Sequence, residues 1–164
     1  MSESALLADL DVLGIASQCH EHSAVFTVEE SADLHAAIAG LHTKNLFLKD
    51  AGGQFWLVTV RHDLRVDLKA LASVVGSKKL SFGKPEDMEA LLGITPGAVT
   101  PLAAINDTAG AVRVVLDRAL AAAATVNVHP LRNTATLGLS GADLCTALRH
   151  WGHDPMLADI PERT

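Results

Sequence analysis

The spacing of two β-prone runs places the strongest limit on how this chain can fold. Residues 43–49 and 55–60 are such runs, and only Asp50-Ala-Gly-Gly-Gln54 separates them. Parallel neighbours need a crossover of about a dozen residues or more, whereas a short link rich in glycine closes a hairpin. The two runs are therefore predicted to be antiparallel neighbours in one sheet.

Capping residues and short apolar runs predict the other elements. Ser4, the Thr27-Val-Glu-Glu30 capping box, Asp67, Pro85 and Ser140 mark helix starts, and Gly14, Gly40, Gly76 and Gly93 mark helix ends. Helices are predicted over residues 4–13, 27–40, 68–75, 85–92 and 141–151. Further strands are predicted over residues 24–26, near Leu80, and over 102–105, 112–116, 125–128 and 134–139, and the tail after Gly152 is predicted to be loop and frayed end.

The order of these elements predicts the fold class. Strands and helices interleave irregularly, and most links between strands are too short for right-handed helical crossovers. A mixed, partly antiparallel sheet in the α+β class is expected. With 164 residues, of which 49% are hydrophobic and 20% charged, the chain is predicted to form a single globular domain over residues 1–164.

Cysteine usage and the apolar runs indicate the compartment. Cys19 and Cys145 are the only cysteines, and the acidic N-terminal stretch has no basic start followed by an apolar run. The longest apolar stretch, residues 119–126, is far below the roughly 20 residues of a membrane-spanning helix. A cytoplasmic protein without a secretory signal or a membrane segment is expected.

The net charge limits how this chain could bind nucleic acid. A formal charge of −6 argues against a protein that coats nucleic acid through charge alone, so any such contact must be local. Lys78, Lys79 and Lys84 form the nearest basic patch, with Lys44 and Lys49 on another segment. A solvated lysine-bearing turn is the alternative interpretation of that patch.

Lys44 and Asn45 are polar residues at the entry of the first run of the hairpin. Strand alternation sends Leu46 and Leu48 to one face and Asn45 and Phe47 to the other. At least one polar group near Lys44 therefore points where packing is expected. An exposed lysine at a strand edge is the alternative.

Two later segments also offer hydrogen-bonding groups. Residues 93–101 contain two glycines and two prolines, which fix a loop whose backbone N–H and C=O groups could hold a small polar substrate. His129 ends a predicted strand, and Asn133, Thr134 and Thr136 follow with neutral polar side chains. An ordinary connector and a structural histidine are the alternatives.

Together these segments resemble the aminoacyl-tRNA editing domain of the YbaK-like family, most closely its free-standing alanyl-prolyl-tRNA deacylases. The resemblance extends from about Glu21 to His150. The motifs that carry it are Val25-Phe-Thr-Val-Glu-Glu30, Lys44-Asn-Leu-Phe-Leu-Lys-Asp50, Asp67-Leu-Lys-Ala-Leu71, Leu80-Ser-Phe82, the Gly-x-x-x-Pro pattern from Gly97 to Pro101, Ile105-Asn-Asp107, His129-Pro130 and Asn133-Thr-Ala-Thr136.

The resemblance implies a particular form of the α+β class. The expected fold is a mixed sheet of six or seven strands, curled toward a barrel, with helices packed outside and a pocket at its mouth. It also implies that the catalytic set is Lys44, Asn45 and His129. In this family the lysine is placed to hold the phosphate and terminal adenosine of the tRNA acceptor end, while Asn45 and His129 match positions that orient the ester.

The implied substrate pocket contains mostly neutral groups. Our candidate substrate-binding residues are Gly97, Ala98, Val99, Thr100 and Pro101, together with Thr27, Asn133 and Thr134. The family is thought to need little or no protein nucleophile and no cofactor, because a water or the neighbouring ribose hydroxyl takes part directly. An aminoacyl ester is already activated, so orientation and oxyanion stabilisation could suffice.

The resemblance also implies a substrate and a partner. A synthetase pocket for proline cannot strongly reject smaller alanine, because missing methylenes are worth only about 1–3 kcal/mol. We therefore expect hydrolysis of alanine from mischarged proline tRNA, with prolyl-tRNA synthetase as a candidate partner. A cysteine-specific deacylase and a non-catalytic module that binds the tRNA end are the alternatives.

Two other kinds of site find little support in the sequence. His20-Glu-His22 offers two metal ligands, but no Cys-x-x-Cys or His-Glu-x-x-His pattern supplies the rest, so no metal site is expected. Cys145 lies within the apolar pattern of the last predicted helix and is interpreted as a core residue rather than a nucleophile.

Overall fold

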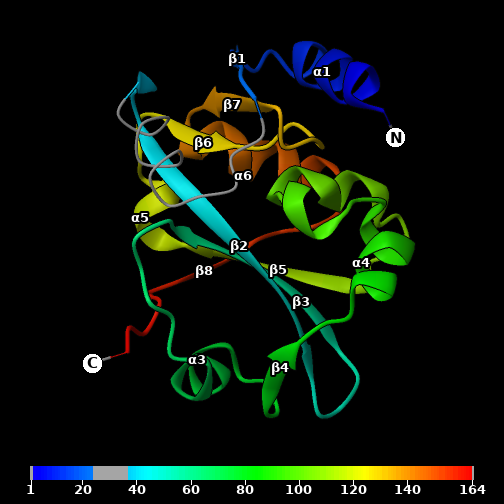
Figure 1. The fold of residues 1–164 in the computed structure, drawn as a ribbon, viewed down its shortest axis with the longest axis vertical. Coiled ribbons are helices and arrows are strands. Elements are labelled where there is room, and N and C mark those ends of the chain that lie inside the picture. The colour runs from blue at the N-terminus through cyan, green and yellow to red at the C-terminus, as the bar shows by residue number, and fades with distance from the viewer. Residues whose placement is uncertain (1, 24–36, 164) are drawn as a thin grey trace.

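The computed structural model describes residues 2–23 and 37–163, and within them it combines a mixed β-sheet with short helices (Figure 1). The strands are β1 (Gln18–Glu21), β2 (Leu41–Asp50), β3 (Phe55–Arg61), β4 (Leu80–Phe82), β5 (Val112–Asp117), β6 (Val126–Val128), β7 (Ala135–Leu139) and β8 (Met156–Ala158). The helices are α1 (Glu3–Val12), α3 (Leu68–Val75), α4 (Pro85–Leu92), α5 (Arg118–Ala121) and α6 (Gly141–His150), with 3-10 turns η1 (Pro96–Ala98) and η2 (Pro101–Asn106).

The described strands form one eight-stranded sheet in the order β1-β7-β6-β2-β3-β5-β8, with β4 also paired to β2. The β2–β3 hairpin is antiparallel, as predicted, while the β2–β6, β3–β5 and β5–β8 pairs are parallel. The mixed sheet and the α+β class are confirmed. The expected curl toward a barrel stops short of closure, because the terminal strands β1 and β8 do not pair with each other.

Strand β2 joins the two halves of the sheet and changes partner along its length (Figure 1). One edge of β2 pairs with β3 over residues 43–49. On the other edge, β6 pairs with Leu41 and His42, and β4 pairs with residues 48–50. Among the described residues, no strand pairs with that edge over residues 43–46, and this interval is called the β2 gap below.

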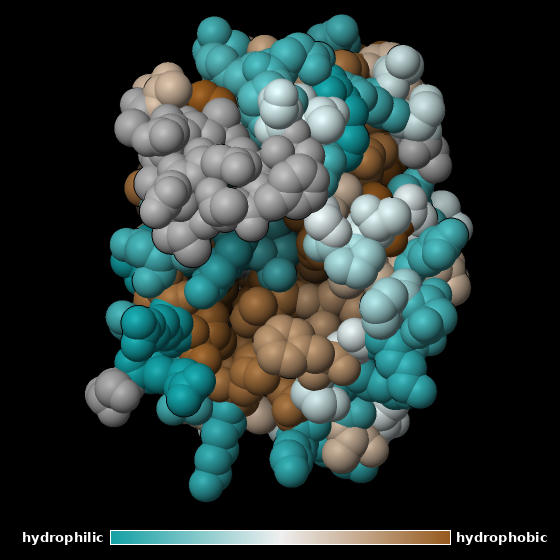
Figure 2. All heavy atoms as spheres, in the orientation of Figure 1, coloured by the Kyte–Doolittle hydropathy of each residue, from teal (hydrophilic) through white to brown (hydrophobic). Residues whose placement is uncertain are grey.

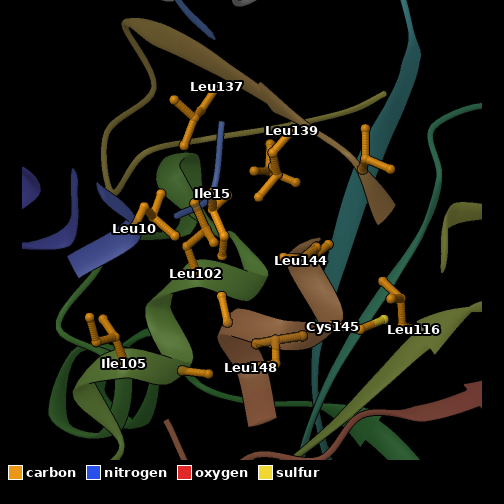
Figure 3. Close-up of a cluster of buried hydrophobic side chains, with 14 of the residues drawn as sticks. Leu10, Ile15, Leu102, Ile105, Leu116, Leu137, Leu139, Leu144, Cys145 and Leu148 are labelled. Carbon is orange, nitrogen blue, oxygen red and sulfur yellow. The ribbon is translucent and has the colours of Figure 1, made fainter. Parts of the chain in front are cut away.

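Packing on the two faces of β2 follows the alternation predicted from the sequence. Leu46 and Leu48 pack with Val58 and Val60 in one hydrophobic cluster, whereas Phe47 packs with Leu57 in another. A third cluster lies between α6, β7 and η2, where Leu102, Leu137, Leu139, Leu144 and Leu148 converge with Leu10 from α1 (Figure 3). The sheet therefore has hydrophobic cores on both faces.

The clearest local predictions concern helix ends. Asp67 begins α3 by accepting a hydrogen bond from the backbone N–H of Ala70, and Gly76 ends it with a φ of +74°, as predicted. At α1 the prediction was wrong by two residues, because Ser2 rather than Ser4 caps the helix by accepting from Ala5. The predicted strand at residues 24–26 and most of the predicted helix at 27–40 lie outside the described residues.

Two predictions from local sequence were wrong. Residues 102–105 form part of η2 rather than a strand, because Pro101 lacks a backbone donor and the Thr100 hydroxyl accepts from the N–H of Leu102. The tail after Gly152 is ordered, because β8 pairs with β5 and Val66 forms a bridge with Glu162. Strand β1 was not predicted. No helix in the described part of the chain is long and apolar enough to span a membrane.

A buried acid and histidine anchor the start of the C-terminal tail. The side chains of Asp107 and His153 are almost fully buried, and His153 Nε2 lies 2.9 Å from Asp107 Oδ2. Asp107 also accepts hydrogen bonds from the backbone N–H groups of Ala111 and Val112. The same carboxylate therefore ends η2, holds the start of β5 and fixes the tail.

We predict that Asp107→Ala lowers the free energy of unfolding by roughly 3 kcal/mol or more, because it leaves buried donors and a buried histidine without their acceptor. The matched control is Asp159→Ala, which removes an exposed ion pair with Arg118 and should cost about 0.5 kcal/mol or less. Urea unfolding of both variants measures the difference. Equal costs would contradict the anchoring role.

Candidate functional site

The candidate site lies where β2 and β6 separate. These parallel strands pair only at Leu41 and His42 of β2 with Val126 and Asn127 of β6. Lys44 and Asn45 follow the paired stretch on β2, and His129 follows β6 by one residue. The predicted catalytic residues therefore leave the parallel ladder at the same end.

The side-chain amide of Asn45 is held on both sides. Asn45 lies opposite Thr59 in the hairpin, and the fully buried Thr59 hydroxyl donates to Asn45 Oδ1 at 2.5 Å. Asn45 Nδ2 donates to the carbonyl oxygen of Val99 at 3.0 Å. The two bonds fix the orientation of the amide and tie the 97–101 loop to the hairpin.

The 97–101 loop uses some of its polar groups to hold itself in place. The Val99 carbonyl accepts from Asn45, and the buried Thr100 hydroxyl caps η2. Gly97 is exposed, and a Cβ at this position would lie only 3.2 Å from Nδ2 of Asn133. The structure thus brings Asn45, the loop and Asn133 together.

His129 is half-buried and is held in one tautomer. Its Nδ1–H donates to the carbonyl of Ala135 at 3.2 Å, and its Nε2 has no hydrogen-bond partner in the described part of the chain. Burial lowers the pKa of His129 below its ordinary 6.5, against the opposing effect of the bond to Ala135. The ring is therefore neutral near neutral pH, and Nε2 can accept a hydrogen bond.

His22 interacts electrostatically with His129, whereas from the sequence we considered His22 only as a possible ligand at a metal site that we did not expect. Its Nδ1–H donates to Ser23 O at 2.8 Å, so Nε2 accepts from the Thr136 hydroxyl at 2.9 Å. The electrostatic interaction with His22 is a smaller cause of the lowered pKa of His129. No spacing in the sequence pairs residue 22 with residue 136, so this contact could not be predicted.

Arg132 stabilises the turn between His129 and Thr134 through side-chain interactions. It forms ion pairs with Glu3 at 2.6 Å and Glu21 at 2.5 Å, and it donates to the Thr134 hydroxyl at 2.8 Å. The preceding residue, Leu131, has a φ of +70°, which costs energy in a residue other than glycine. The ion pairs hold this strained turn in place, and no sequence motif predicted them.

Lys44 points away from Asn45, because neighbouring residues of a strand face opposite sides of the sheet. Its half-buried side chain lines a pocket together with Leu46, and its ammonium has no ion-pair partner among the described residues. No hydrogen bond in that part of the chain joins Lys44 to His129 or to the 97–101 loop. Thr27 lies outside the described residues.

The arrangement offers neutral hydrogen-bonding groups on one face of β2 and, on the other face, the Lys44 ammonium, which has no ion-pair partner among the described residues. Asn45, Asn133 and the neutral ring of His129 can orient a polar substrate without a formal charge, while Lys44 can bind an anionic group. Over residues 2–23 and 37–163 there is no cluster of three or more potential metal ligands. The chemistry best matched is hydrolysis of an activated bond in a substrate that carries phosphate.

Comparison with known proteins identifies one family. Residues 22–147 match the model of the aminoacyl-tRNA editing domain. The chain is 40% identical over 144 residues to the prolyl-tRNA editing protein ProX of Acetoanaerobium sticklandii, covering 87% of this chain and 88% of that protein. It is 42% identical over 162 residues to prolyl-tRNA synthetase associated domain-containing protein 1 of Bos taurus, covering 96% and 94%.

The fold is also found among solved structures. A candidate trans-editing enzyme for prolyl tRNA synthetase superposes with a TM-score of 0.69 and 20% sequence identity, covering 100% of this chain and 99% of that one. At this identity the likeness shows the fold alone.

We predict that His129→Gln reduces the loss of stability at acidic pH. The pKa of His129 is lowered in the folded state, so as the pH drops the unfolded chain takes up a proton at this residue before the folded protein does. The free energy of unfolding of the wild type therefore falls as the pH drops below about 6.5. Urea unfolding over a pH series measures the effect. The free energies of unfolding of the wild type and His129→Gln should differ by a constant amount above about pH 7.5, and the two curves should converge or cross below that pH. Parallel curves throughout would contradict the prediction.

Proposed function

The chain belongs to the aminoacyl-tRNA editing domain family and is an aminoacyl-tRNA deacylase, and on this premise we propose that it removes alanine from mischarged proline tRNA. The ProX relative, which is named as a prolyl-tRNA editing protein, supports proline tRNA as the substrate. The observation that carries the proposal is that consecutive residues of β2 supply two kinds of group: Lys44, without an ion-pair partner among the described residues, on one face, and Asn45, held by Thr59 and Val99, on the other.

Lys44 supplies the charge that binds the substrate. The last nucleotide of a tRNA carries a phosphate next to the esterified ribose, and an ammonium forms a strong charge-assisted contact with a phosphate oxygen. Lys44 is unpaired in the described part of the chain, so it has no internal ion pair to break. We assign it to the phosphate of the terminal adenosine.

The neutral groups orient the ester and the water. The water oxygen attacks the ester carbonyl carbon, the bond to the ribose oxygen breaks, and that oxygen takes a proton to become a hydroxyl. Asn45 and the 97–101 loop hold the ester, while Nε2 of His129 can accept a hydrogen bond from the water or from the neighbouring ribose hydroxyl. No protein nucleophile is required.

Size selects the amino acid in this proposal. A pocket that closes on a single methyl group excludes proline, because the ring cannot enter a well-packed small cavity without strain. Serine costs additional desolvation in an apolar cavity, and cysteine is the hardest competitor because it adds one heavy atom. The name of the Bos taurus relative, prolyl-tRNA synthetase associated domain-containing protein 1, supports prolyl-tRNA synthetase as a partner that works on the same tRNA.

We predict that Lys44→Ala lowers kcat/KM for proline tRNA charged with alanine by about ten- to a hundredfold. This is the effect of losing a hydrogen bond to a charged group. The matched control is Lys49→Ala, which removes an exposed lysine from the same strand and should change kcat/KM by less than about twofold. Both variants should melt near the wild-type temperature. Wild-type turnover by folded Lys44→Ala would refute its role.

The rates on a panel of charged tRNAs test the substrate. Proline tRNA carrying alanine, serine, cysteine or proline is incubated with the purified protein, and the release of each amino acid is compared with spontaneous hydrolysis. We expect alanine to be released fastest and proline to remain attached. Faster release of cysteine would assign a cysteine deacylase, and rates equal to spontaneous hydrolysis throughout would indicate a non-catalytic binding module.

A further inference from the structure

An open pocket of about 630 Å³ lies beside the β2 gap, on the face of the sheet that carries Lys44. Its walls come from β2, β4, the start of α3 and the C-terminal end of the chain. Figure 2 shows a hollow on this side of the molecule, with an apolar floor and hydrophilic residues along its rim. The pocket is lined by the apolar side chains Leu46, Val66, Leu68 and Phe82 and the charged side chains Lys44, Arg65, Asp67 and Arg163.

The positive charge of this pocket is not neutralised within the described residues. Arg65, Arg163 and Lys44 form no ion pair there, whereas Arg61, Arg118, Arg132 and Arg149 each pair with a carboxylate. Among the described residues that line the pocket, Asp67 is the one carboxylate, and it caps α3 by accepting a hydrogen bond from the N–H of Ala70. In a chain with a formal charge of −6, three unpaired cations around one pocket are a local site for an anion.

The backbone holds the two arginines next to each other. The N–H of Arg163 donates to the carbonyl oxygen of Arg65 at 2.7 Å, and the neighbouring residues Val66 and Glu162 form an antiparallel bridge. Arg163 belongs to the tail that β8 and the bridge hold on the sheet. Both guanidinium groups are therefore positioned on one wall of the pocket.

An exposed aromatic ring also lines the pocket. Phe82 is 67% exposed at the end of β4, where it pairs with Leu48 of β2. Aromatic rings next to lysine and arginine are the combination that binds single-stranded nucleic acid, because bases stack on the ring and phosphates contact the cations.

We propose that this pocket binds the unpaired nucleotides that precede the terminal adenosine of the tRNA acceptor end. One base stacks on Phe82, and Arg65 and Arg163 contact the phosphates that lead to the terminal nucleotide at Lys44. Lys44 belongs to the pocket and precedes Asn45, so a strand that passes through the pocket reaches the β2 gap. The inference rests on the proposed function, since it takes an aminoacyl-tRNA as the substrate.

The test compares a long and a short substrate. Steady-state kinetics are measured with alanyl-proline tRNA and with the alanyl ester of adenosine, which lacks the preceding nucleotides. The variants are Phe82→Ala and the double variant Arg65→Gln/Arg163→Gln. Arg149→Gln is the control for loss of a surface arginine outside the pocket, because Arg149 lies on α6 and pairs with Asp154.

For the tRNA substrate, we expect each pocket variant to raise KM about tenfold with little change in kcat, the effect of losing one stacked base or a phosphate contact. The same variants should leave hydrolysis of the adenosine ester unchanged, and Arg149→Gln should resemble the wild type on both substrates. An unchanged KM for tRNA, or an equal loss on both substrates, would overturn the assignment of this pocket.

Binding of uncharged proline tRNA, followed by fluorescence anisotropy, separates this inference from the proposed function. Weaker binding by the pocket variants, with no deacylation by the wild type, would support the pocket and refute the proposed function. Deacylation by the wild type, with equal tRNA binding by all variants, would refute the pocket alone. Phe82, Arg65 and Arg163 are exposed, so their substitution should leave the fold intact. Thermal melting of each variant checks this.

Discussion

The change of partners along β2 is the constraint on which the rest of the site depends. Its edge opposite β3 is paired first with β6 and then with β4, and over residues 43–46 it has no strand partner in the described structure. The hairpin with β3 continues across this interval, so the backbone stays rigid where the second edge is open. A polar residue in the β2 gap is therefore held in a fixed position at an edge that no described strand covers.

The two faces of β2 have different roles in the proposed function: one face binds the anionic substrate, and the other orients the ester. Lys44 lies on the face of the pocket with Arg65 and Arg163, where an anionic chain can bind. Asn45 lies on the other face, where Thr59 and Val99 fix its amide and hold the 97–101 loop. Strand alternation thus separates a cationic surface from a set of neutral hydrogen-bonding groups, although the two residues are neighbours in sequence.

Patterns within a few neighbouring residues were enough to predict some elements of the fold. The Asp50–Gln54 link gave the hairpin, Asp67 and Gly76 gave both ends of α3, and alternation gave the faces of Leu46 and Phe47. Contacts between distant residues could not be predicted in this way. The ion pairs of Arg132 with Glu3 and Glu21, and the attachment of the tail through β8, depend on pairings that no spacing in the sequence encodes.

The central claim is that the Asn45 amide, oriented by Thr59, positions the 97–101 loop that holds the ester in the proposed reaction. Thr59→Val keeps the volume of a buried side chain but removes the hydroxyl that donates to Asn45, while Thr146→Val on α6 is the control. The direct measurement is the single-turnover rate constant for deacylation of alanyl-proline tRNA at saturating protein. The account predicts a loss of about five- to tenfold for Thr59→Val, with unchanged tRNA affinity and an unchanged rate for the control. A rate constant equal to that of the wild type, in a folded Thr59→Val protein, would contradict it.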